Sequence, residues 1–181
     1  GVSDCSELGE PWHTGLAAPP AASDIAAALA QLARGCPSHV SLEYLQSAEN
    51  AGSDVAAFAL GLLFEEGVHI ASDLNVAAHH YRKAAVWGHL EAQHRLGMLL
   101  LGDLAPTEDI EEGLYWLGAA VNQGDGFSAA VIGFLHAHGM RGVRQDPCLA
   151  VSWFDVSEML DGPMEVGELR AEAASIGGAR C

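Results

Sequence analysis

Small and hydrophobic residues recur along this chain at a fixed interval. Glycines at positions 52, 88 and 124 lie 36 residues apart, and Gly162 follows 38 residues later. A second glycine stands nine residues after each of the first three, and each is preceded by Leu or Ile: Gly61, Gly97 and Gly133. Self-similarity at a period of 20 to 50 residues is the signature of a repeat architecture. The pattern therefore predicts repeated units of two helices each.

Two further rows of residues share this period. The first row is aromatic or histidine, at Tyr44, His80, Trp116 and Trp153. The second row is small and stands four residues later, at Ala48, Ala84, Ala120 and Ser157. Residues four apart lie on one face of a helix. One helix pair cannot bury both of its faces, whereas a stack of pairs can. We therefore predict an all-α fold, an α-solenoid of antiparallel helix pairs.

The predicted helix boundaries carry recognisable capping residues. Asp73, Asp109 and Asp146 precede the second helix of each pair, where an Asp side chain can accept hydrogen bonds from free backbone amides. Pro147 follows Asp146 at the first helical position, where its missing N–H is harmless, and Glu112 completes a capping box with Asp109. Each of these helices then ends at a glycine, the residue best suited to a left-handed C-terminal cap.

The mid-helix glycines Gly61, Gly97 and Gly133 predict tight helix crossings. Glycine inside a helix costs about 1 kcal/mol relative to alanine. Three glycines at one aligned position indicate that close packing offsets this cost. The alternative interpretation is that glycine is merely tolerated there.

The repeats give a domain organisation. We expect an extended acidic N-terminal arm over residues 1–20 and a capping helix and tail over 163–181. Between them lies the repeat array, residues 21–162, with opening helices at 21–52 and three units at about 53–88, 89–124 and 125–162.

The last unit and one helix junction resemble a known family. The segment "HGMRGVRQDPCLAVSWF" (138–154) is similar to the loop-and-helix pattern of the Sel1-like repeat, a relative of the tetratricopeptide repeat, with matches at Gly142, Val143, Asp146, Ala150, Trp153 and Phe154. The segment "AAVWGHLEAQHRLG" (84–97) is similar to the family's helix-turn-helix junction. The resemblance covers about residues 40–162. His80 in place of the usual Trp, and Gly113 in place of a helix Ala, depart from the pattern.

The net charge of the chain limits the classes of partner that it is expected to bind. The chain has 24 Asp and Glu against 8 Lys and Arg, a formal net charge of −16. Nucleic acids and anionic membranes are bound through Lys and Arg, so we expect neither as a partner. A basic or amphipathic protein partner fits better. The chain also lacks the run of about 18 apolar residues that a membrane span requires, so we expect a soluble chain without membrane insertion.

Four cysteines fall as two pairs near the ends of the chain. Cys5 and Cys36 are 31 residues apart, and Cys148 and Cys181 are 33 apart. Disulfides within these pairs would hold the two ends of an elongated body, and the alternative is four independent thiols. The chain begins at Gly1 without Met, and the sequence does not identify its cellular compartment. A processed secreted, periplasmic or organellar chain fits the cysteine content.

The outward face of the first helices predicts a binding groove. Taking the mid-helix glycines as core-facing, the neighbouring helical stripe is largely apolar and consists of Phe58, Leu62, Glu65, His94, Met98, Leu101 and Phe134. An apolar strip on an acidic body is typical of a groove for a peptide or an amphipathic helix. The alternative is that Leu62, Met98 and Phe134 belong to the core.

The sequence carries no recognisable catalytic, cofactor or metal motif. P-loop, G-x-S-x-G, H-E-x-x-H and dinucleotide fingerprints are missing. The histidine spacings, such as His136 with His138, do not match the three or four residues of a helical metal pair. We therefore expect a non-enzymatic protein without cofactor or metal.

These features lead to one functional hypothesis and two alternatives. The hypothesis is a scaffold, an adaptor or a non-catalytic subunit of a larger complex, which binds a partner segment in its concave groove. One alternative is a purely architectural subunit whose apolar stripe is permanently packed. The other, suggested by cysteine-rich relatives, is a small-molecule or peptide-processing enzyme.

Overall fold

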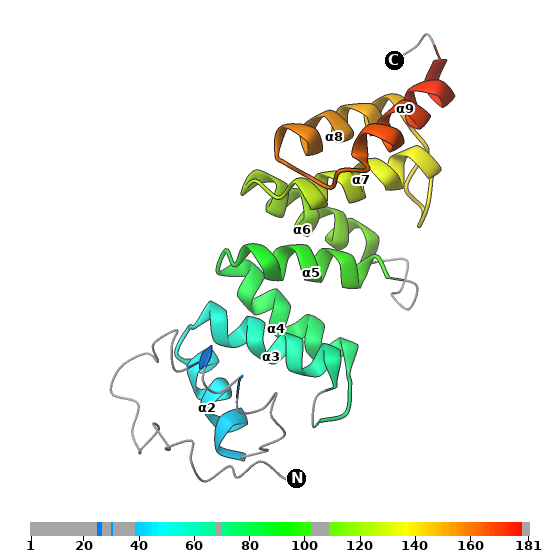
Figure 1. Ribbon diagram of the computed structural model, residues 1–181. Helices are drawn as coiled ribbons and strands as arrows, with labels where there is room; N and C mark the ends of the chain where they lie inside the picture. The colour runs from blue at the N-terminus through cyan, green and yellow to red at the C-terminus, as the bar shows by residue number, and fades with distance from the viewer. Residues whose placement is uncertain (1–24, 27–29, 31–38, 68–69, 103–108, 179–181) are drawn as a thin grey trace, which may run out of the picture. The chain divides into compact units, whose positions relative to one another are not determined.

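A computed structural model of the chain describes residues 25–26, 30, 39–67, 70–102 and 109–178. The predicted opening helix at 21–35, the N-terminal arm, and Cys5, Cys36 and Cys181 lie wholly or largely outside these residues. The described residues form eight helices (Figure 1): α2 (His39–Asn50), α3 (Asp54–Glu66), α4 (Leu74–Val86), α5 (Leu90–Leu100), α6 (Ile110–Asn122), α7 (Gly126–His138), α8 (Pro147–Met159) and α9 (Val166–Gly177). The all-α prediction is confirmed.

The chain divides into two compact units, one up to Ala92 and one from Gln93 onward. In the N-terminal unit, α2 and α3 pack around a core that includes Leu45 and Leu60, both fully buried, and α4 packs on α3. The buried Glu49 of α2 holds α4 through hydrogen bonds to His80 (2.6 Å) and Lys83 (2.9 Å). His80 thus occupies the buried aromatic row and also carries a polar contact.

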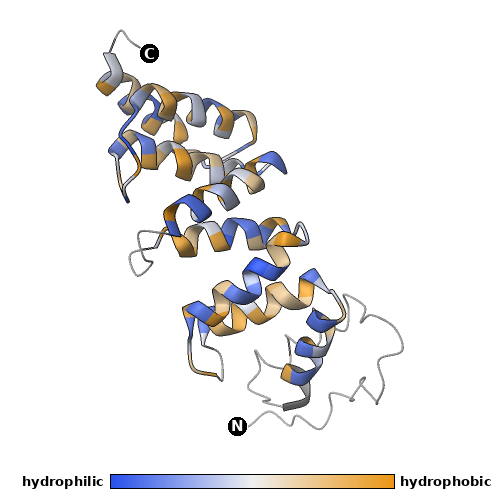
Figure 2. Ribbon diagram, turned by 180° about the vertical axis from the view of Figure 1, so that it is seen from behind, coloured by the Kyte–Doolittle hydropathy of each residue, from blue (hydrophilic) through white to orange (hydrophobic). Residues whose placement is uncertain are grey.

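The C-terminal unit contains α6 to α9 and most of α5. Its helices carry bands of hydrophobic and hydrophilic residues along their length (Figure 2). One core cluster surrounds Leu117 and Ile132, and a second surrounds Phe154 and Val166. Both clusters lie where the apolar stripes of neighbouring helices meet, as expected for amphipathic helices.

The mid-helix glycines lie at tight crossings, as predicted. A Cβ atom on Gly61 would lie 2.4 Å from the ring of Tyr81, and one on Gly97 would lie 2.7 Å from Leu117. A Cβ on Gly133 would lie 2.8 Å from the ring of Phe154. In each pair, a large buried side chain of the second helix fills the space that the glycine leaves open.

Two of the three predicted aspartate caps are confirmed. Asp73 accepts hydrogen bonds from the amides of Asn75 and Val76, and Asp146 accepts one from Leu149. The capping box at Asp109 is wrong, because the backbone of Asp109 is already helical and its side chain caps no amide. Glu112 instead accepts a hydrogen bond from Trp116 Nε1.

The turn after α8 differs from the other turns. Gly52, Gly88 and Gly124 have positive φ angles, but at the fourth position Asp161 has φ 53° in place of Gly162. Gly162 serves a different purpose, since a Cβ there would lie 2.0 Å from Ser157 Oγ. This glycine is required by close contact and not by its backbone conformation.

Within the described ranges, every helix is too short or too polar to cross a membrane.

Candidate protein-interaction surface

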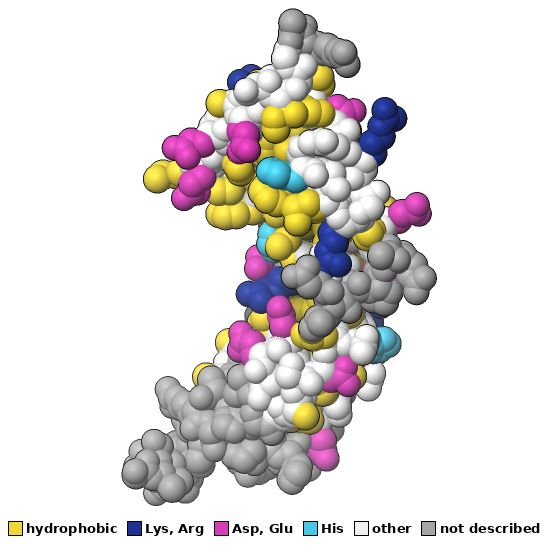
Figure 3. Space-filling model, turned by 90° about the vertical axis from the view of Figure 1, so that its right-hand side faces the viewer, with side chains coloured by type: hydrophobic (Ala, Val, Ile, Leu, Met, Phe, Trp, Pro, Cys, Tyr) yellow, Lys and Arg dark blue, Asp and Glu magenta, His cyan; other side chains and the backbone are white. Residues whose placement is uncertain are grey.

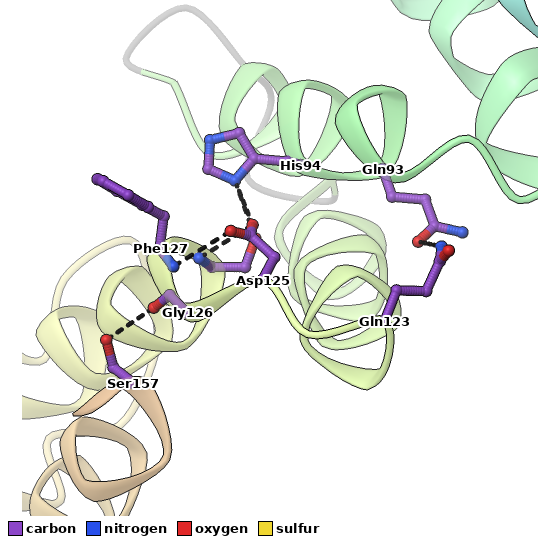
Figure 4. Close-up of polar contacts among 8 residues, drawn as sticks. Gln93, His94, Gln123, Asp125, Gly126, Phe127 and Ser157 are labelled. Atoms are coloured by element: carbon purple, nitrogen blue, oxygen red, sulfur yellow. Dashed lines mark hydrogen bonds and ion pairs between the residues drawn. The ribbon is translucent and has the colours of Figure 1, made fainter. Parts of the chain in front are cut away.

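A polar cluster ties α5 to α7 in the C-terminal unit. Nδ1 of His94 lies 2.9 Å from both Asp125 Oδ2 and Ser128 Oγ (Figure 4). Asp125 also caps α7 by accepting hydrogen bonds from the amides of Phe127 and Ser128. The side chain of Ser128 is fully buried and donates to the same carboxylate. One carboxylate thus sets both the start of α7 and its position against α5.

Two further hydrogen bonds hold the neighbouring helices. Gln123, after α6, donates from Nε2 to Oε1 of Gln93 on α5 at 2.8 Å. Ser157 on α8 donates from Oγ to the carbonyl of Gly126 at 2.7 Å, where both residues are buried. These contacts, drawn in Figure 4, hold α5 against the end of α6 and α7 against α8.

Residues of α5, α7 and α9, and of the loops that follow or precede them, line an open cavity of about 410 Å³. We call it the apolar cavity. Four of its large hydrophobic side chains are exposed: Met98 (43%), Phe127 (56%), Phe134 (38%) and Met140 (45%). The other lining residues are Leu101, Gly102, Ala130, Val131, Leu135, Arg141, Pro163 and Leu169. A connected exposed apolar surface of this kind marks an interaction site more often than single exposed residues do.

Three predicted groove residues belong to the N-terminal unit. Phe58 is half-buried and stacks on His89, with ring centroids 4.4 Å apart. Leu62 and Glu65 are also half-buried, and Glu65 accepts a hydrogen bond from the Tyr81 hydroxyl. Here Phe58 and Glu65 make internal contacts, so their role in partner binding stays a prediction.

The other four predicted groove residues belong to the C-terminal unit. Met98 and Phe134 are exposed and line the same cavity. Leu101 also lines it but is 9% exposed and belongs to the core around Leu117. The side chain of His94 is hydrogen-bonded to Asp125 and Ser128, which indicates that it positions α5 against α7.

Several lining residues were missed by the sequence analysis. Phe127 stands seven residues before Phe134, so extending the same helical stripe by two turns would have found it. Met140 and Pro163 lie outside the helices, where periodicity gives no signal. Leu169 lies on α9, a helix treated only as a polar end cap.

Acidic side chains surround one side of this surface. Figure 3 shows hydrophobic side chains gathered on one face of the C-terminal unit with acidic groups beside them. Glu165, the residue before α9, and Glu172 on α9 stand four residues before and three after Leu169, and both are exposed. They share its helical face. The nearby Arg170 pairs with Asp155 of α8.

The histidines and the cysteine within the described ranges form no further site. The ring of His136 donates a hydrogen bond to the carbonyl of Arg144, and that of His138 donates to Phe134. No group of three or more potential metal ligands occurs among the residues that the structure describes. Cys148 is disulfide-bonded; its predicted pairing with Cys181 concerns a residue outside the described part and stays a prediction.

Fold and site together define a helical-repeat protein with an apolar surface on its first helices. The family model described as "Sel1 repeat" matches residues 54–85, 90–125 and 127–156, more than half of the chain. The chain therefore belongs to the Sel1 repeat family, as its sequence motifs predicted. Such repeats generally mediate protein interactions and are usually non-catalytic.

Solved structures show the same fold. A Sel1 repeat protein from Oxalobacter formigenes is 24% identical, with a TM-score of 0.67, over 90% of this chain and 68% of that one. A protective antigen present in uropathogenic Escherichia coli strains, described as displaying an SLR fold, is 19% identical with a TM-score of 0.64. That match covers 85% of this chain and 38% of the antigen. No curated protein matches the sequence.

Proposed function

We propose that this chain is a scaffold, an adaptor or a non-catalytic subunit that binds a segment of a protein partner in the apolar cavity. The observation that carries the proposal is the exposure of Met98, Phe127, Phe134 and Met140 around one cavity. Leaving four large hydrophobic side chains in water is unfavourable by about 25 cal/mol per Å² of apolar surface. Covering them with a partner recovers this free energy.

The rigidity of the cavity walls supports the same function. α5 is tied to α7 through His94 and Asp125, and α7 is tied to α8 through Gly126 and Ser157. A preformed surface loses little conformational freedom when a partner binds, which favours affinity. Among the described residues that line the cavity, Arg141 is the one ionisable residue, so these residues offer no pair of acid and base groups. Binding therefore fits this cavity better than proton-transfer catalysis.

The experiment is a selection of displayed random peptides on the wild-type chain. Enriched peptides are then tested against the double variant Met98→Gln/Phe134→Gln. Both replacements are polar and neutral, so they remove apolar contact without adding charge. We expect binding to fall at least tenfold, because roughly 1.5 to 3 kcal/mol is gained by burying each large apolar side chain. The thermal unfolding transition, followed by circular dichroism, should remain.

A matched control is Met159→Gln/Ile176→Gln. Both side chains are exposed, at 81% and 52%, and neither lines the cavity. This variant should bind as the wild type does. Enriched peptides that bind both double variants equally, or a selection that enriches nothing, would overturn the proposed function. If the Met98/Phe134 variant loses its unfolding transition, those residues are core, and Phe127→Gln then provides the test of binding.

A further inference from the structure

We infer that the segment held in the apolar cavity is an amphipathic α-helix with Lys or Arg beside its apolar face. This inference rests on the proposed function and specifies the chemistry of the partner. It is argued from the backbone of the cavity walls, from the lining side chains and from the charges next to them.

The backbone of the walls favours a helical ligand. Three sides of the cavity are the helices α5, α7 and α9, whose amides and carbonyls are largely paired within each helix. The described residues contain no β-strand, so they offer no sheet edge to which an extended peptide could add. An extended peptide would bring unpaired backbone groups against an apolar surface, which is costly. A helix satisfies its own backbone and presents only side chains.

The lining side chains suit the apolar face of such a helix. Met98 and Met140 are unbranched and adaptable, and methionine is enriched at surfaces that accept varied apolar partners. Phe127 and Phe134 supply flat aromatic area. The volume of about 410 Å³ lies in the range of pockets that bind whole ligands, so it has room for several apolar side chains. A helix delivers such anchors at positions i, i+3 or i+4, and i+7.

The charges select a basic ligand. Glu165, which directly precedes α9, and Glu172 on α9 lie on the side that contributes Leu169 to the cavity. Asp161 lies two residues before the lining residue Pro163. All three carboxylates are exposed. The positive charge of Arg170 is directed to Asp155 on α8. Arg141, in the loop after α7, is a positively charged lining residue, so basic residues of the ligand are expected only on the side that faces α9. A helix with Lys or Arg on the side facing α9 complements this arrangement, and complementary charges mainly raise the association rate and specificity.

The test uses four synthetic 18-residue peptides labelled for fluorescence anisotropy. The first combines leucine and lysine with all leucines on one helical face. The second has the same composition with the leucines scattered, the third keeps the leucine pattern but replaces lysine by glutamate, and the fourth contains two central prolines. We expect the first peptide to bind, and each of the other three to bind at least tenfold more weakly.

Variants of the chain locate the binding. Phe134→Gln should weaken binding of the first peptide at least fivefold through lost apolar contact. Glu165→Gln/Glu172→Gln should weaken it about fivefold, as expected for two exposed charge pairs, and this difference should shrink at high salt. The control is Glu111→Gln, an exposed carboxylate on α6, which contributes no lining residue. It should bind as the wild type does.

The outcomes separate this inference from the proposed function. Equal binding of the scattered, proline-containing or glutamate peptide would overturn the amphipathic basic helix. So would unchanged binding by the Glu165/Glu172 variant. If no designed peptide binds while displayed peptides still depend on Met98 and Phe134, the inference falls and the proposed function stands. If neither set binds, both fall.

Discussion

Gly133 of α7 packs directly on the ring of Phe154 of α8, leaving no space for a side chain at position 133. A Cβ atom there would lie 2.8 Å from two ring carbons, and Phe154 is fully buried. The ring is held by the surrounding core and cannot move aside at low cost. The glycine is therefore a requirement of the helix crossing.

Gly133→Ala should destabilise the protein even though alanine is the better helix former. Overpacking typically costs about 1 to 3 kcal/mol, and the gain in helix propensity returns about 1 kcal/mol. We expect a net loss of up to about 2 kcal/mol in the free energy of unfolding, measured by urea denaturation. The control is Gly118→Ala in α6, where a Cβ meets no atom within 4 Å. That variant should be as stable as the wild type or more stable, and equal destabilisation of both would contradict the packing argument.

Ser157→Ala should remove a buried anchor between α8 and the start of α7. The hydroxyl donates to the carbonyl of Gly126 at 2.7 Å, and both residues are buried. Leaving a buried carbonyl without its partner costs about 1 to 3 kcal/mol. The same denaturation experiment measures this loss. Ser152→Ala is the matched control, since the Ser152 hydroxyl is exposed and bonds within its own helix. A change below about 0.5 kcal/mol in both variants would show that the Ser157 bond contributes little.

Glu49 should make the free energy of unfolding depend on pH in the acidic range. Burial by itself raises the pKa of Glu49, but the hydrogen bonds and charges of His80 and Lys83 outweigh it, so the pKa lies below the ordinary value of 4.5. Because the folded pKa is lower than the unfolded one, this stabilisation is present above the ordinary value and is lost as pH falls through the folded pKa. The wild type should therefore lose stability on acidification below about pH 5.

The Glu49→Gln variant tests this dependence. Its free energy of unfolding should be lower than that of the wild type at pH 7, and the difference should narrow as pH falls below about 5. Unfolding curves at a series of pH values measure both slopes. Glu66→Gln, which replaces an exposed carboxylate on α3, should follow the wild-type profile. A Glu49→Gln profile parallel to that of the wild type would argue against a stabilising charge at Glu49.

Oxidation of the cavity methionines should weaken peptide binding. Hydrogen peroxide transfers one oxygen atom to the thioether sulfur and leaves water, which turns an apolar side chain into a polar sulfoxide. Met98 and Met140 are exposed enough to react. Placing a sulfoxide against an apolar ligand should reduce affinity about tenfold, as measured by anisotropy after mild peroxide treatment.

The variant Met98→Leu/Met140→Leu identifies which methionines matter. It retains the more exposed Met159 and Met164, so it is still oxidised, but its cavity stays apolar. It should bind peptide equally before and after peroxide. A similar loss of affinity in this variant would place the effect outside the cavity.

The repeated glycines show how far local patterns reach. The spacing of Gly61, Gly97 and Gly133 was sufficient to predict three equivalent tight crossings, because helical periodicity and the space available to a Cβ are local properties. Asp109 shows the limit. Its position matched the caps at Asp73 and Asp146, but its backbone is helical and its side chain makes no cap. The backbone conformation at position 109 decides this, and the period of the repeat carries no information about that conformation.

The sequence by itself determined the family and the all-α helix pairs, because each depends on residues a few turns apart. It left open whether Met98 and Phe134 belong to the core or to a groove. Only the tertiary structure decided that Leu101 is buried, that His94 is bound to Asp125, and that Phe127, Met140 and Leu169 join the cavity. These features depend on how closely and at what angle neighbouring helices pack. A shift of one helical position, about 100°, moves a side chain from the core to solvent. The repeat period fixes the spacing of residues along the chain, but it does not fix the rotation of one helix against its neighbour.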